Sequence, residues 1–102
     1  MDPRELTDAI VKWGRDKNIN NPYLQCLKMY EEAGEITREL VRNRLTTEEI
    51  KDGIGDTFVT LAILADILGY DVFDCAAMAY KEIAPRTGKT INGCFVKGNE
   101  NG

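Results

Sequence analysis

The sequence of 102 residues contains no histidine. A Ser-His-Asp triad, a Cys-His pair, an HExxH zinc site and a carboxylate–histidine di-iron site each require an imidazole, so all four are excluded. Any chemistry must therefore use carboxylates, lysines, arginines, hydroxyls or water. Oxygen ligands of this kind select Mg²⁺, Mn²⁺ or Ca²⁺ over softer metals.

Cysteine is scarce, and the three cysteines, Cys26, Cys75 and Cys94, include no CxxC pair. An odd number of widely spaced cysteines favours reduced thiols over a disulfide framework. The N-terminus lacks the basic start and apolar stretch of a signal peptide. The longest apolar run, FVTLAILADILG, is about half as long as a bilayer span and contains Asp66. We therefore expect a cytoplasmic protein that has no membrane partner.

Positive charge is also in short supply, since the net charge is -4 and the lysines and arginines are scattered. This balance argues against a nucleic acid polymer as the partner. It does not exclude a nucleotide, because a divalent cation reverses the charge of an acidic site. The length and the 43% apolar content are typical of one domain, expected over residues 1–102. A core of this size is modest, so association between copies would add stability.

Hydrophobic periodicity predicts an all-α protein with four helices. The first helix is expected over about residues 3–16, with Pro3 in its first turn. The second should begin at Pro22, after the cap Asn21, and run to about residue 43.

The third and fourth helices have comparable start and stop patterns. Thr46 or Thr47 is expected to cap the third helix, which should end near residue 68 before Gly69. Asp71 is expected to cap the fourth, which Pro85 ends or kinks. The dipeptide Asn92-Gly93 predicts a hairpin over residues 90–96. The expected fold is a four-helix bundle, completed by oligomerisation, with a short C-terminal β-hairpin or extended tail.

Acidic residues gather in the stretch YEEAGEITRE of the second helix, which contains Glu31, Glu32, Glu35 and Glu39. A helical wheel places them opposite an apolar arc formed by residues 26, 27, 29, 30, 33, 36, 40 and 41. On this helix alone, a solvated face is the simpler interpretation, because Lys28 is spaced to pair with Glu31 or Glu32.

The third helix favours a site instead. Nine of its twelve residues 57–68 are apolar and point in every direction, the pattern of a helix buried on all sides. One short chain can hardly enclose such a helix, which indicates a dimer or larger homo-oligomer. Asp52 and Asp56 lie on one side of this helix and would enter the buried surface together. Buried carboxylates need a cation. Lys28, Arg38 or Arg42 could supply it, but the acids of both helices together favour a divalent metal.

Glycines interrupt both acidic segments. Gly34 lies in the first, and Gly53 and Gly55 lie in the second. Glycine costs helix stability, so these positions are expected where a ligand or a partner helix approaches closely.

Taken together, LKMYEEAGEITREL, IGDTFVTLAILADILGYD and the tail RTGKTINGCFVK resemble the MazG-like all-α nucleoside triphosphate pyrophosphohydrolases, especially short phage-type members. The likeness covers most of the chain. The family pattern is ExxE, a spacer and ExxD, with four acids that bind Mg²⁺ in a bundle built by dimers or tetramers. Glu32 and Glu35 match the first half, Glu31 matches an additional leading acid, and Asp56 matches the last ligand. Gly53 stands where the third acid is usual, and Asp52 is expected to replace it.

This resemblance implies Mg²⁺-dependent hydrolysis of nucleoside triphosphates to a monophosphate and pyrophosphate, with Mn²⁺ as a possible substitute. It implies metal binding by Glu31, Glu32, Glu35, Asp52 and Asp56, with Glu35 or Glu32 as the proton acceptor. The residues expected to contact substrate are Lys28, Gln25, Lys81, Arg86 and Lys89. An ordinary polar helix end would explain the last three equally well, and a solvated surface amide is the simpler interpretation of Gln25.

Three alternatives stay open at this point. Trp13 and Tyr30 could stack on a base, although aromatic residues at helical spacing more often belong to a core. A homo-oligomer that lost its metal site at Gly53 could bind nucleotide or a protein without turnover. A purely structural dimerisation domain is the third interpretation.

Overall fold

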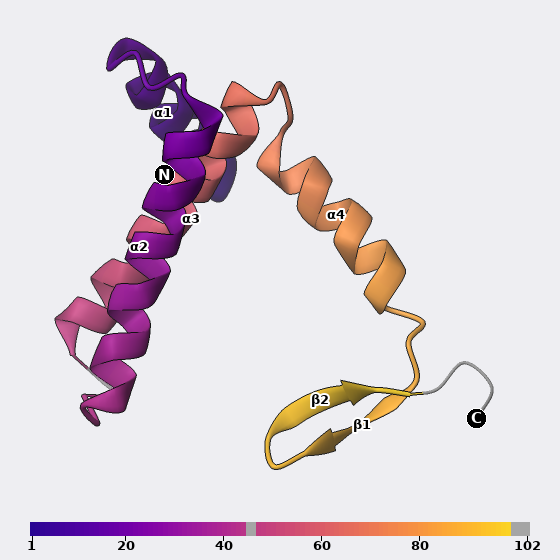
Figure 1. Cartoon of the computed structure of the whole chain (residues 1–102). Helices are drawn as coiled ribbons and strands as arrows, with labels where there is room; N and C mark the ends of the chain where they lie inside the picture. Colours follow the sequence, from indigo (N-terminus) through magenta and orange to yellow (C-terminus); the bar gives the residue numbers. More distant parts are fainter. Residues whose placement is uncertain (45–46, 99–102) are drawn as a thin grey trace. The chain divides into compact units, whose positions relative to one another are not determined.

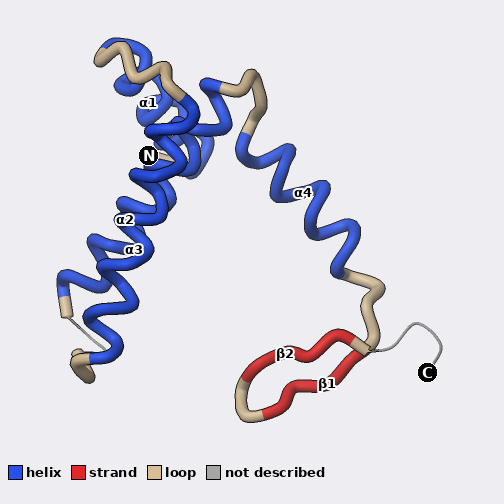
Figure 2. Tube along the Cα trace, in the orientation of Figure 1, coloured by secondary structure: helices blue, strands red, loops and turns tan. Residues whose placement is uncertain are grey.

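The described part of the chain forms four helices and one β-hairpin, as predicted (Figures 1 and 2). The computed structural model describes residues 1–44 and 47–98. Two compact units are present, Met1–Val72 and Phe73–Gly102, and each is described by itself. The single domain expected over the whole chain stays a prediction. The elements are α1 (Pro3–Asp16), α2 (Pro22–Val41), α3 (Glu48–Ile67), α4 (Val72–Ile83), β1 (Gly88–Ile91) and β2 (Cys94–Lys97).

Local capping explains where these helices begin and end. The Asn21 side chain accepts hydrogen bonds from the first amides of α2. Thr47 caps α3 by accepting from the Ile50 amide at 3.4 Å, whereas the alternative cap, Thr46, lies outside the described residues. Gly69 follows α3 with φ of 82°, the left-handed conformation expected of a C-terminal glycine. Asp2, which the sequence analysis did not identify, caps α1.

Helices α2 and α3 pack along each other and form the centre of the first unit (Figure 1). Gly53 permits their close approach, because a Cβ atom there would lie only 2.9 Å from Ile36 Cγ1. The predicted role of Gly53 is therefore confirmed. A Cβ at Gly34 or Gly55 would meet no atom of the described residues within 4 Å, so nothing within this chain requires glycine there.

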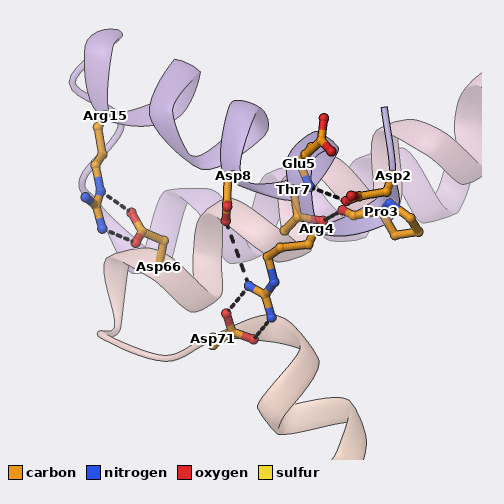
Figure 3. Close-up of polar contacts among 9 residues, drawn as sticks. All are labelled: Asp2, Pro3, Arg4, Glu5, Thr7, Asp8, Arg15, Asp66 and Asp71. Atoms are coloured by element: carbon orange, nitrogen blue, oxygen red, sulfur yellow. Dashed lines mark hydrogen bonds and ion pairs between the residues drawn. The ribbon is translucent and has the colours of Figure 1, made fainter.

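Helix α1 crosses α3 nearer its C-terminal end. A Cβ at Gly14 would lie 3.1 Å from Ile63 Cγ1, so α1 approaches α3 closely at this point. Arg15 donates two hydrogen bonds to Asp66, of 2.9 and 2.6 Å, in a fork geometry that Figure 3 shows. A second fork joins Arg4 to Asp71, just before α4 begins. These contacts hold α1 against the last turns of α3 and the segment that follows.

The core that these helices enclose is small. The buried hydrophobic residues are Ile50, Ala62, Ile63 and Ala65. Among the described residues only α1 and α2 pack against α3, so the burial on all sides that was expected of this helix in an oligomer stays a prediction. An apolar stripe at seven-residue spacing, Ile54, Leu61 and Leu68, stays exposed, with exposed fractions of 58%, 39% and 51%.

The second unit contains α4 and the hairpin. Strands β1 and β2 are antiparallel, with Ile91 opposite Cys94 next to the turn. Asn92 and Gly93 both have positive φ, 51° and 77°, as a type I′ turn requires. The hairpin prediction is therefore confirmed. Among the described residues, no helix is long and apolar enough to span a membrane.

Candidate acidic site between helices α2 and α3

The face of α2 that packs on α3 carries buried polar side chains beside the apolar Ile36. Its buried residues are Gln25, Glu32 and Glu39, separated by seven residues and therefore on one side of the helix. The Gln25 amide Nε2 donates to the Thr60 carbonyl oxygen at 3.1 Å, which explains how its side chain is accommodated. Glu32 and Glu39 are therefore not part of the solvated face that α2 taken alone suggested.

Glu32 lies close enough to Asp56 of α3 for its charge to act on that carboxyl group. The pKa of Asp56 is raised, first by its burial, then by the negative charge of Asp52, and next by that of Glu32. The positive charge of Lys28 acts in the opposite direction. Asp56 is half-buried and Asp52 is exposed. We call Glu32, Asp52 and Asp56 the acidic cluster. It joins acids of both helices in one electrostatic environment, in which the negative charge on Asp56 is not fully compensated.

Lys28 is the cation closest to this cluster among the ion pairs of the described residues. Its Nζ lies 3.4 Å from Glu32 Oε1 and 3.6 Å from Glu31 Oε2. The charges of Glu31 and Glu32 raise the pKa of Lys28, so the lysine is held in its charged form. Pairing with Lys28, one of the alternatives to a metal, is therefore present for Glu32.

The other predicted ligands lie on the exposed side of α2. Glu31 and Glu35 are both exposed. Glu39 was not predicted as a site residue, yet it is buried, and its Oε2 lies 3.5 Å from Arg44 Nη1. Its spacing of seven residues from Glu32 was the sequence pattern that pointed to a shared face.

The acidic cluster suits Mg²⁺ in kind, because every side-chain donor is a carboxylate oxygen and the negative charge exceeds the nearby positive charge. Side chains do not converge into a complete cage, however. Within residues 1–44 and 47–98, no group of three or more aspartate, glutamate or cysteine side chains is placed to hold one metal ion. Gly53, where the family pattern has an acid, faces Ile36 and leaves no room for a larger side chain.

The remaining predicted substrate residues fall into two groups. Gln25 is buried and bonded within the α2–α3 contact, so we assign it to helix packing. Lys81, Arg86 and Lys89 belong to the second unit. There Arg86 lies 3.5 Å from Glu82 and lines a cavity of about 310 Å³ together with Thr87 and Lys97.

Comparison with known proteins identifies one relative of the phage kind. The chain is 37% identical over 67 residues to an "uncharacterized 18.2 kDa protein in rep-hol intergenic region" of Haemophilus phage HP1. The aligned part covers 63% of this chain, and the chain spans 40% of the length of that relative. No family model and no solved structure matches the sequence.

Proposed function

We propose that this protein is a Mg²⁺-dependent hydrolase of the MazG-like type, which converts nucleoside triphosphates, in particular deoxynucleoside triphosphates, to a monophosphate and pyrophosphate. The observation that carries the proposal is the grouping of Glu32 of α2 with Asp52 and Asp56 of α3, and the raised pKa of Asp56 is in keeping with it. An uncompensated carboxylate in such a place suits a cation-binding role.

Acidic residues of both α2 and α3 are proposed to bind the metal ion. Asp52, Asp56 and Glu32 would supply carboxylate oxygens to Mg²⁺ together with Glu31 and Glu35 on α2, although no three such side chains of the described residues are already placed around one ion. Mg²⁺ held there would neutralise charge on the triphosphate and lower the pKa of a water molecule. Mn²⁺ prefers the same oxygen ligands and is the expected substitute.

A glutamate of α2 is proposed to accept the proton of the attacking water. Water oxygen forms a bond to the α phosphorus, the bond from that phosphorus to the α–β bridging oxygen breaks, and pyrophosphate leaves. Glu35, which is exposed beside the buried Glu32, accepts the proton of the attacking water, and Glu32 is the second candidate. Lys28 offers a positive charge to the phosphates. The substrate contacts expected of Lys81, Arg86 and Lys89 stay predictions from the sequence, because these residues belong to the second unit.

A second copy of the chain completes the proposed assembly. The side of α2 opposite the buried stripe carries a seam at alternating spacings of four and three residues, as in helices that pair. Every position of this α2 seam is exposed. Apolar surface of this extent indicates a partner, and a homodimer or homotetramer would also cover the stripe on α3. The seam consists of Tyr23, Leu27, Tyr30, Gly34, Thr37 and Val41.

Turnover of a panel of deoxynucleoside triphosphates with Mg²⁺, scored separately for pyrophosphate and phosphate, tests the proposal. We expect pyrophosphate alone, and we expect Asp56→Asn to lower kcat roughly a hundredfold or more, since even outer-shell partners of metal ligands cost 10–100-fold. Asp16→Asn is the matched control, because Asp16 pairs with Lys12 on α1 and lies outside the acidic cluster. Equal turnover by both variants would contradict the proposal.

One observation favours a second candidate function. Gly53 occupies the position of an acidic ligand in the family pattern, and Ile36 fills the space above it. If Asp52 does not replace that ligand, the chain is a helical homo-oligomer that binds nucleotide or a protein partner without hydrolysing it. Equilibrium dialysis with labelled deoxynucleoside triphosphate separates the two functions, since binding without pyrophosphate release identifies the second.

A further inference from the structure

An apolar groove lies between α1 and α3, outside the acidic cluster. Ala9, Ile10 and Trp13 form one wall and Val59 forms the other, and the groove has a volume of about 320 Å³. Trp13 is 52% exposed, so it is not the core residue that its helical spacing favoured. It is also the single tryptophan of the chain.

The groove adjoins the acidic cluster along α3. Val59 follows Asp56 by three residues, so their side chains lie on the same side of the helix, one turn apart. The rise between them is roughly 4.5 Å along the helix axis. A molecule that spans both would have an apolar part against Trp13 and an anionic part toward Asp56 and its cation.

The chemistry of the groove matches a base better than a charged group. Its four lining residues carry no charge, and the indole N–H of Trp13 is the one polar side-chain group among them. Aromatic residues bind bases through their faces, which all bases possess. A side chain of a second copy is the rival occupant, but the α2 seam lies on the side of α2 that faces away from α3, separate from this groove.

We infer that the groove formed by Ala9, Ile10, Trp13 and Val59 is the nucleobase subsite, with Trp13 as the stacking platform. The inference rests on the proposed function and adds a specificity to it. A subsite that stacks the base, with no side chain that reads the base edge apart from one N–H, discriminates weakly between bases. The substrate class is therefore nucleoside triphosphates of any base, with larger purines favoured over pyrimidines by their stacking area.

Kinetics on the full chain tests this subsite, with inorganic tripolyphosphate as a competitor that has no base. We expect Trp13→Leu to raise KM for dATP and dCTP roughly tenfold or more, because base stacking of this kind is worth a factor of that size. Trp13→Phe should recover most of the affinity. The inhibition constant of tripolyphosphate should change by less than about twofold in both variants, because neither substitution alters the contacts that bind the phosphates.

Three further measurements distinguish loss of the subsite from a folding effect. Ala9→Phe fills the groove without altering Trp13 and should also raise KM for nucleotides alone. Fluorescence of Trp13 in the unmodified protein should be quenched by α,β-methylene-dATP with Mg²⁺ and not by tripolyphosphate with Mg²⁺. Circular dichroism of each variant should match that of the unmodified protein.

The inference is overturned if Trp13→Leu shifts the nucleotide KM and the tripolyphosphate inhibition constant by the same factor. It is also overturned if Trp13 fluorescence is not quenched when nucleotide and Mg²⁺ are added. A third contradicting result is a kcat/KM that differs by more than about a hundredfold among the four bases, because hydrogen bonds to the base edge bring discrimination of at least that size. Failure of the proposed function has a different signature. The unmodified protein would then release no pyrophosphate, while base-dependent quenching of Trp13 would still support the subsite.

Discussion

Replacement of Gly53 by alanine tests the closeness of α2 and α3, on which the acidic cluster depends. The added Cβ would lie 2.9 Å from Ile36 Cγ1 and 3.8 Å from Ile36 Cδ1, and the first distance is too short for two carbon atoms. Ile36 Cγ1 is next to the Ile36 backbone, so the helices must separate or the side chain must leave its rotamer. Overpacking of this kind costs about 1–3 kcal/mol.

Gly55→Ala is the matched control on the same helix. A Cβ at Gly55 meets no described atom within 4 Å, so alanine should stabilise α3 by about 0.5–1 kcal/mol through helix propensity alone. The difference between the two variants isolates the steric cost. For a domain of this size, about 1–3 kcal/mol corresponds to a difference in Tm of at least about 4 °C.

The assay is thermal unfolding followed by circular dichroism, in the wild-type and Ile36→Ala backgrounds. Truncation of Ile36 removes the atoms that the new Cβ would meet, so Gly53→Ala and Gly55→Ala should then change Tm by the same amount. This double-mutant cycle assigns the cost to one pair of residues. A Gly53→Ala protein that gains as much stability as Gly55→Ala, with Ile36 intact, would refute the close approach of the helices.

Three further predictions concern charge and capping. Because the pKa of Asp56 is raised, its ionised form is disfavoured in the folded protein, so Asp56→Asn should raise Tm at pH 7 without Mg²⁺, and the gain should vanish as pH falls through the folded-state pKa. The hydrogen bonds and charge of Arg15 lower the pKa of Asp66, so this pair should stabilise the fold above the ordinary pKa of 3.8. That stabilisation should be lost as pH falls through the lowered value, and Asp66→Asn should flatten this part of an acid-unfolding curve. Asn21→Ala should cost about 1 kcal/mol in urea unfolding, because two amides of α2 lose their acceptor.

Element boundaries were predictable because the interactions that set them are local. Asn21 and Pro22 open α2 through contacts within the next three residues. Asn92 and Gly93 adopt positive φ in the turn itself, whatever the rest of the chain does. Helix ends and the hairpin therefore follow from short stretches of sequence.

The direction in which each helix faces was not predictable in the same way. A helical wheel shows an apolar arc on α2, but it does not say whether this arc packs within the chain or against another molecule. The buried stripe turned out to be polar because Gln25 reaches the Thr60 carbonyl, 35 residues away, which no local pattern reveals. Glu39 was missed for the same reason. The pairing of Arg15 with Asp66 also joins residues 51 positions apart.

The candidate site was predictable in its residue types and in part of its arrangement. Spacing indicated that Asp52 and Asp56 share one side of α3, and the resemblance placed Glu32 of α2 with them; the charge of Glu32 does act on Asp56. Gly53 was recognised as a departure from the family pattern, but its steric reason required Ile36, which the sequence does not place beside it.

Thermal unfolding with and without Mg²⁺ is the most direct test of a shared site on α2 and α3. A ligand present at about a hundred times its Kd stabilises the folded state by about 2.7 kcal/mol, which is a rise of several degrees in Tm. We expect this rise in the unmodified protein and in Asp16→Asn, and its loss in both Glu32→Gln and Asp56→Asn. An equal rise in the Glu32→Gln/Asp56→Asn double variant, or no rise in the unmodified protein at any Mg²⁺ concentration, would contradict a metal site built from these two helices.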